Sequence, residues 1–268
     1  MGKRITITML LLMCTAALLT AHDLFLKLDT YFVPPGTAVR VAVLNGTFAK
    51  SEGAVAARRL KDLSVVGPEG RRQLPRDAWT PSGDTTWLTV ATGAAGTYVI
   101  GASLTPNQIA LSAEDFNEYL REDGIPDVLE ARTRSGELGR AVRERYQKHV
   151  KAILQVGEAR TDAFRTVLGY PAELVPVTNP YTAGIGDTLA VRCLVDGQPV
   201  AGQLVIAGGE RDGRSWQEMR TRTNEHGVAR FNLNTAGKWY IKFIHMKAVS
   251  VDSVNYESKW ATLTFEMR

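Results

Sequence analysis

Apolar and polar residues alternate along much of the chain after residue 22, and this pattern predicts a mainly β protein. Apolar side chains occupy every second position over 24–28 and again over 39–43. A Pro-Pro-Gly break at 34–36 separates the two runs, and Asn45-Gly46 forms a turn signal after the second. Two further short runs, 87–90 and 96–100, extend the β pattern of the first part of the chain.

The periodicity changes over residues 105–168, where we expect helices. Ser112 is a good helix N-cap and Asp115 follows it three residues later, as in a capping box. Apolar residues at 116, 119 and 120 share one helical face, and Gly124 ends the helix. A second, charged helix is predicted from about 137 to 154, with an apolar stripe formed by Val142, Tyr146, Val150, Ile153 and Leu154.

From about residue 173 the β pattern returns, with frequent short strands and turns. Expected strands cover 189–195, 203–207, 227–233, 238–246 and 260–265. This spacing is typical of immunoglobulin-like or transthyretin-like sandwiches. We therefore predict a mainly β protein with two such β-sandwich domains, at 22–104 and 169–268, and a helical insert at 105–168 between them.

The two β regions resemble each other in sequence. Residues 36–46 parallel 186–197 with one insertion, and Ala95-Gly96 with its following strand parallels Ala236-Gly237. Duplication of one sandwich explains this similarity. The alternative is that any two sandwiches share such turns and alternation, because both features follow from the fold.

Residues 1–21 have the three parts of a secretory signal peptide. Lys3 and Arg4 precede an apolar stretch, and small residues at 16, 17 and 21 suit signal peptidase. The apolar stretch is short for a membrane span. We expect a soluble protein in the periplasm or secreted, not membrane-spanning once the signal is removed. Cleavage after Ala21 competes with cleavage after Ala17.

Composition and charge exclude several classes of function. The net charge of +4 includes Lys3 and Arg4 and contains no basic block, so no nucleic-acid partner is expected. Cys14 lies in the signal, which leaves Cys193 alone in an alternating strand pattern, where it fits a small buried apolar residue. No nucleophile elbow, phosphate loop or paired-cysteine metal motif is present.

Histidines carry the chemistry that the sequence offers. Cleavage after Ala21 makes His22 the N-terminal residue, whose α-amine and ring Nδ1 close a chelate ring on a metal ion. An α-amine has an ordinary pKa of about 8, so a metal displaces its proton near neutral pH. Nitrogen-rich tetragonal sites suit Cu(II) or Ni(II). The alternative for His22 is a solvated chain terminus.

His245 is the second candidate ligand, at the end of the predicted strand 239–246. Alternation places it on the same face as Trp239, Ile241 and Phe243. It is either a hydrogen-bonded core residue or a ligand at the core edge. We expect His226 to be solvated in a turn and His149 to lie on the surface of the charged helix. Trp239 and Trp260 fit core positions.

The sequence resembles the family of exported proteins called domain of unknown function 4198, whose members are often described as similar to the substrate-specific component of nickel or cobalt uptake. Segments at 21–26, 116–124, 143–146, 151–157, 173–180, 196–199, 237–246 and 258–265 carry the resemblance. It implies a periplasmic setting and a link to transition-metal traffic. It also selects His22 and His245, which lie within these segments.

Three hypotheses follow. The first is a periplasmic protein that binds a divalent transition metal, copper or nickel/cobalt, through His22 and His245, as an accessory in uptake or handling with an envelope or transport protein as partner. The second is a non-catalytic interaction module that binds a carbohydrate or an envelope protein. The third and weakest is a copper-dependent oxidative enzyme; no catalytic residues are predicted.

Overall fold

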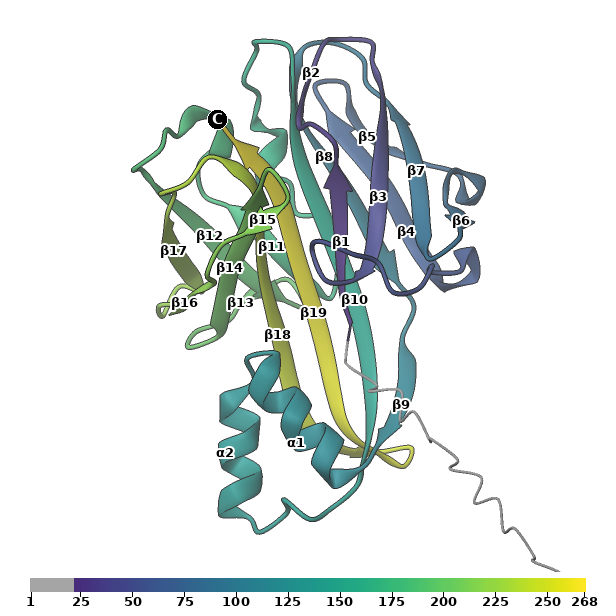
Figure 1. Ribbon diagram of the computed structural model, residues 1–268, viewed down its shortest axis with the longest axis vertical. Coiled ribbons are helices and arrows are strands. Elements are labelled where there is room, and N and C mark those ends of the chain that lie inside the picture. Colours follow the sequence, from purple (N-terminus) through teal and green to yellow (C-terminus); the bar gives the residue numbers. More distant parts are fainter. Residues whose placement is uncertain (1–21) are drawn as a thin grey trace, which may run out of the picture.

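The computed structural model describes residues 22–268, and the predicted signal peptide lies outside them. The described chain is mainly β, as predicted (Figure 1). Its first half contains β1 (Asp23–Leu28), β2 (Phe32–Val33), β3 (Ala38–Gly46), β4 (Leu60–Gly67), β5 (Gly70–Gln73), β6 (Thr80–Ser82), β7 (Thr85–Ala91), β8 (Gly96–Leu104), β9 (Asn107–Leu111) and β10 (Val142–Val156).

The second half continues with β11 (Ala172–Pro176), β12 (Thr188–Val195), β13 (Gln198–Pro199), β14 (Leu204–Arg211), β15 (Arg214–Ser215), β16 (Met219–Arg222), β17 (Val228–Asn232), β18 (Gly237–Val251) and β19 (Val254–Met267). Two α-helices, α1 (Ala113–Glu122) and α2 (Pro126–Arg134), lie between β9 and β10. Short 3₁₀ turns are η1 (Ala57–Arg59), η2 (Arg76–Ala78), η3 (Asp162–Arg165) and η4 (Pro180–Thr182).

Within residues 22–268 the strands form one large sheet and two smaller ones. The large sheet has the order β15-β14-β18-β19-β10-β8-β4-β5; in addition, β16 pairs with β14, and β2 and β9 pair with β10. One small sheet has the order β1-β3-β7-β6, and the other contains β11, β12, β13 and β17. Figure 1 shows the long strands β10, β18 and β19 running side by side through the middle of the molecule.

Each small sheet packs against one half of the large sheet and encloses a core. The first core joins leucines of β1 and valines of β3 to apolar residues of β4, β8 and β10. The second joins β11, β12 and β17 to β14, β18 and β19, with both Trp239 and Cys193 fully buried. The prediction that Cys193 acts as a small core residue is thus confirmed.

The prediction of a second helix over 137–154 is wrong, because most of this segment belongs to strand β10. Val150, Ala152, Leu154 and Val156 pack in the first core, whereas Ile153 packs in the second. Burial on both faces removes the simple alternation expected of a strand. Buried polar residues, among them Lys148 and Lys151, further gave this strand the appearance of a solvated helix.

The first predicted helix is confirmed, with Ser112 as its N-cap. The Ser112 hydroxyl accepts a hydrogen bond from the Asp115 backbone N–H at 3.1 Å. Phe116, Tyr119 and Leu120 are buried in a third apolar cluster, against the ends of β10, β18 and β19. After Gly124, whose φ of +75° suits glycine, α2 starts at Pro126. The sequence pattern did not predict α2.

Strands of the two similar sequence regions occupy corresponding positions. β3 pairs antiparallel with β1 and β7 at the centre of one small sheet. β12 pairs antiparallel with β11 and β17 at the centre of the other. The two strands that follow Ala-Gly in sequence, β8 and β18, both belong to the large sheet. The topology therefore repeats where the sequence does.

Candidate functional site

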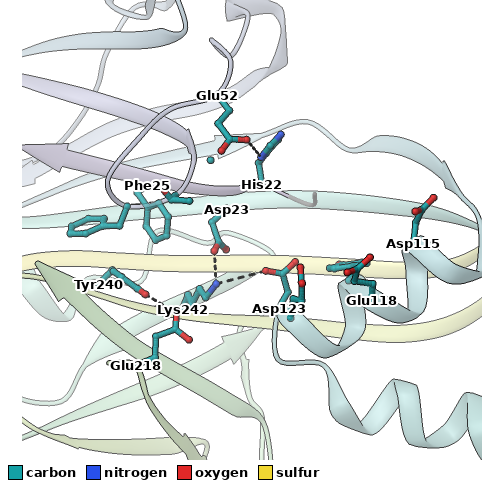
Figure 2. A pocket seen from close by; sticks show the side chains of 15 residues that line it. His22, Asp23, Phe25, Glu52, Asp115, Glu118, Asp123, Glu218, Tyr240 and Lys242 are labelled. Carbon is teal, nitrogen blue, oxygen red and sulfur yellow. Dashed lines mark hydrogen bonds and ion pairs between the residues drawn. The ribbon is translucent and has the colours of Figure 1, made fainter. Parts of the chain in front are cut away.

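His22 lies directly before β1 at the edge of a cavity of about 440 Å³. Its Nδ1 is 3.1 Å from Oε2 of Glu52, and the two side chains are 31% and 41% exposed. Glu52 comes from the loop after β3, which returns to that strand through the Gly46–Ser51 bridge. The buried ammonium of Lys148 donates a hydrogen bond to the His22 carbonyl. His22 is therefore held by contacts on both its side chain and its backbone. Figure 2 shows the side-chain contact with Glu52.

Acidic and aromatic residues from several elements line this cavity, which we call the His22 cavity. Its lining consists of His22, Asp23, Phe25, Gly46, Thr47, Phe48, Glu52, Asp115, Glu118, Tyr119, Glu122, Asp123, Glu218, Tyr240 and Lys242. β1 and the loop after β3 form one side, and α1 with the residue after it forms another. β18 contributes Tyr240 and Lys242.

A buried ion pair fixes the start of β1 to β18. The ammonium of Lys242 contacts Oδ2 of Asp23 and lies 3.9 Å from Oδ1 of Asp123 (Figure 2). Burial, together with the nearby charge of Asp23, raises the pKa of Asp123 to about 7. This carboxyl thus changes its charge near neutral pH, within reach of the cavity.

Lys148 and Glu144 of β10 interact with residues that line the cavity: Lys148 with Asp23 and Asp123, and Glu144 with Tyr119. Burial lowers the pKa of Lys148 to about 8, although Asp23 and Asp123 oppose this shift. Burial also raises the pKa of Glu144 to about 7, against hydrogen bonds donated by Ser258 and by Tyr119. Several groups with shifted pKa values therefore gather at one place, which is typical of functional sites.

The structure places His245 away from His22. β18 continues to Val251, so His245 lies inside the strand and not at its end, which corrects that prediction. By strand alternation, His245 is on the face of β18 that carries Trp239 and Phe243, as predicted. Lys242 is on the other face of β18, where it pairs with Asp23, the residue after His22. His245 lines a separate cavity of about 160 Å³.

The environment of His245 is that of a hydrogen-bonded core-edge residue. Its Nδ1 is 3.1 Å from Oε1 of Gln203. Partial burial lowers its pKa, and the positive charges of Lys259 and Lys247 lower it further. Among residues 22–268, no group of three or more His, Cys, Asp or Glu side chains is arranged to hold a metal ion.

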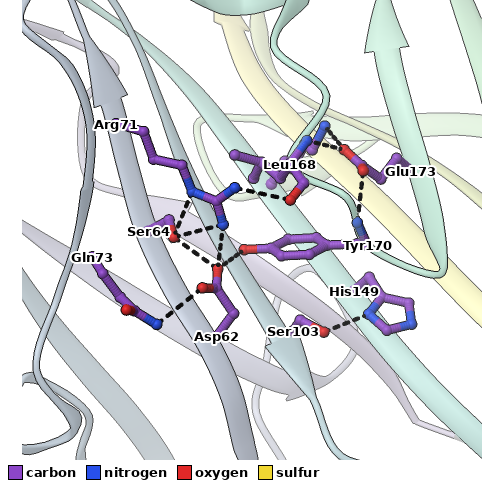
Figure 3. Close-up of polar contacts among 10 residues, drawn as sticks. Asp62, Ser64, Arg71, Gln73, Ser103, His149, Leu168, Tyr170 and Glu173 are labelled. Atoms are coloured by element: carbon purple, nitrogen blue, oxygen red, sulfur yellow. Dashed lines mark hydrogen bonds and ion pairs between the residues drawn. The ribbon is translucent and has the colours of Figure 1, made fainter. Parts of the chain in front are cut away.

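His149 is buried, which corrects the prediction of a surface position. Its Nδ1 lies 2.9 Å from the hydroxyl of Ser103, but both residues are almost fully buried (Figure 3). Burial lowers the pKa of His149 to about 3, so it is neutral. A serine next to a histidine suggests nucleophilic chemistry only where substrate has access, and this pair is closed off.

The neighbouring polar network is structural. Asp62 accepts hydrogen bonds from Tyr170 and from Arg71, whose guanidinium also donates to the carbonyl of Leu168 (Figure 3). β4 and β5 are thereby joined to the segment that leads into β11. Glu173 accepts two backbone N–H groups there and pairs with the buried Lys151. These contacts fasten the two halves of the molecule together.

Several residues of the His22 cavity were not among the predicted site residues. Lys242 interrupts an otherwise apolar strand, and Asp23 starts another. A charge on a strand that is otherwise core is the sequence signal for a buried polar contact. Glu52 and Glu218 carry no comparable signal, because they lie in polar segments and reach the cavity only through the fold.

Comparisons with known proteins give one family and only weak structural similarities. No curated protein matches the chain. The D0-D1 domain of intimin is 14% identical, covers 91% of this chain and 98% of its own, and has a TM-score of 0.22. The human OSCAR ligand-binding domain is 12% identical, with coverages of 91% and 98% and a TM-score of 0.21. Such low scores establish no shared fold.

Trypsin-activated alpha-2-macroglobulin from Escherichia coli is 12% identical, with a TM-score of 0.23; 93% of this chain matches 16% of that one.

No helix within residues 22–268 is long and apolar enough to cross a membrane. The family model for a domain of unknown function, DUF4198, matches residues 19–247, which is most of the chain. The chain therefore belongs to the DUF4198 family, as the resemblance of its segments predicted.

Proposed function

We propose that this protein is exported, is processed after Ala21, and then binds a divalent transition metal, Cu(II) or Ni(II), through His22 as part of metal uptake or handling. The carrying observation is the position of His22 at the edge of an acidic cavity, with its Nδ1 3.1 Å from a carboxylate oxygen of Glu52. Processing adds the α-amine as a third donor to these two.

The resulting donor set suits the proposed metals. An amine, an imidazole and a carboxylate give nitrogen and oxygen ligands, which Cu(II) and Ni(II) bind in tetragonal geometry. Amine and Nδ1 belong to one residue, so they chelate with little loss of conformational freedom. Anchoring of the His22 carbonyl by Lys148 and of Asp23 by Lys242 reduces that loss further.

His245 is not part of the proposed site. It lines a different cavity and lies on the opposite face of β18 from Lys242. The proposal therefore replaces the second imidazole with Glu52.

The test is titration of the chain that begins at His22 with Cu(II) alone and with Ni(II) alone, followed by calorimetry and by electron paramagnetic resonance for Cu(II). Acetylation of the His22 α-amine turns the amine into an amide and adds no other metal-binding nitrogen. We expect it to weaken binding at least about 100-fold, or ~2.7 kcal/mol. Glu52→Gln should weaken binding about 10-fold, because it removes the negative ligand.

His245→Ala is the matched control and should change the affinity less than about twofold. Equal affinity of the acetylated and unacetylated chains would overturn the proposal. Loss of affinity in His245→Ala with no effect of Glu52→Gln would also contradict it, because the second ligand would then be the imidazole.

A further inference from the structure

The His22 cavity is strongly negative although the whole chain carries a net charge of +4. Seven carboxylates line it, against one lysine and His22: Asp23, Glu52, Asp115, Glu118, Glu122, Asp123 and Glu218. A recess lined by one sign of charge concentrates counter-ions and ligands of the opposite sign. The cavity is therefore selective for cations.

The carboxylates do not converge on one point. They come from β1, the loop after β3, α1 with the residue after it, and the segment before β16. No three of the metal-binding side chains in residues 22–268 are grouped for a single ion. Carboxylates spread along a cavity match a ligand that carries several separated positive charges (Figure 2).

One wall of the cavity is apolar. The rings of Phe25, Phe48 and Tyr240 pack together with centroids 5.1–5.3 Å apart. The Tyr240 hydroxyl donates a hydrogen bond to Glu218 at 2.7 Å, so an acidic group lies beside this wall. Methylene groups suit such a surface, and ammonium groups suit the carboxylates around it.

Asp23 supplies a separate indication of a ligand. It is only 9% exposed and lines the cavity, and its Oδ2 contacts Lys242. Its other oxygen, Oδ1, is buried with no hydrogen-bond partner among the described residues. A buried carboxylate oxygen without a donor is costly, so a donor supplied by a ligand would be stabilising.

From these observations we propose that the His22 cavity binds an extended aliphatic polyamine. Its ammonium groups pair with Asp23 and with the carboxylates of α1, and its methylene groups lie against Phe25, Phe48 and Tyr240. The volume of about 440 Å³ is in the range of small-molecule sites. This binding does not depend on the α-amine of His22 or on a metal ion.

The test is calorimetric titration with spermidine, a linear triamine, compared with butylamine, which carries one ammonium group. The protein is the chain with one glycine before His22, in metal-free buffer containing a chelator, so that metal binding does not contribute. We expect spermidine to bind at least about 10-fold more tightly than butylamine, because one ammonium group engages fewer carboxylates. The same titration with the unextended chain should give the same spermidine affinity.

The variant Glu118→Gln/Glu122→Gln removes two charges from the cavity on α1, at partly and fully exposed positions. The matched control Glu130→Gln/Glu225→Gln removes two exposed charges elsewhere. We expect the first variant to weaken spermidine binding at least about 10-fold and the control to change it less than about twofold.

Equal weakening in the two variants would show nonspecific attraction and would overturn the proposal. Absence of spermidine binding to the parent chain would overturn it as well. Neither outcome affects the metal proposal, which is measured on the unextended chain with Cu(II) or Ni(II) alone.

Discussion

At the scale of single residues, Asp123 is a carboxyl of the His22 cavity whose pKa is shifted towards neutral pH. Burial and the charge of Asp23 raise its pKa from 3.8 to about 7. An acid whose pKa is raised in the folded state keeps its proton after the unfolded chain has lost it. Folding stability contributed by Asp123 is therefore greatest below about pH 4 and declines as the pH rises to about 7.

We predict that Asp123→Asn removes this decline, because asparagine stays neutral at every pH. The free energy of unfolding of the variant minus that of the parent should be larger at pH 8 than at pH 4.5. The increase between the two pH values should be at most about 4 kcal/mol. Urea denaturation at the two pH values measures it. The exposed Asp162→Asn serves as control and should show no such difference. Parallel pH profiles of Asp123→Asn and the parent would contradict the prediction.

The sequence could indicate His22 but not its neighbours in the cavity. His22 follows small residues that we interpret as a signal-peptidase site, so the hypothesis for His22 came from local sequence alone. Glu52 meets it only because the loop after β3 folds back to that strand. For His245 the prediction was wrong in the opposite way. Its segment belongs to the family pattern, but its side chain lies on the face of β18 opposite to Lys242 and lines another cavity. The type of a residue therefore does not predict which residues far away in the sequence it will contact.

At the scale of elements, α1 carries three of the seven cavity carboxylates, and a fourth, Asp123, directly follows it. The N-cap that stabilises this helix therefore also supports the His22 cavity. Ser112 caps the helix through the Asp115 backbone N–H. We predict that Ser112→Ala lowers the free energy of unfolding by about 1 kcal/mol. Urea denaturation measures this, with the exposed strand residue Ser215→Ala as control. A loss no greater than that of the control would contradict the assigned cap.

β10 shows why elements with buried polar residues are hard to predict. α1 had one apolar face and a cap, and the periodicity gave it correctly. β10 instead buries Glu144, Lys148, His149, Lys151 and Gln155. Each has a partner from a distant segment, such as Glu173 for Lys151 and Thr97 for Gln155. Because such partners lie outside any local window, the strand resembles a charged surface helix.

At the scale of the whole molecule, the two sandwiches share one sheet. β10 contributes to both cores, and the network around Asp62 and Tyr170 joins the halves. We predict that the chain 22–268 unfolds in one cooperative transition. Circular dichroism and tryptophan fluorescence should give coincident urea curves, with Trp79 reporting on the first core and Trp239 on the second. Two separated transitions would show that the halves unfold independently.

The position of β19 also sets an order of events during synthesis. This strand spans residues 254–267, yet it lies between β18 and β10 in the middle of the large sheet. Its parallel pairing with β10 joins residues more than one hundred positions apart. Until β19 has been synthesised, β10 and β18 each keep an open edge, and open edges invite pairing with other chains. The nascent chain therefore keeps these two strand edges unpaired until almost its last residues have been made.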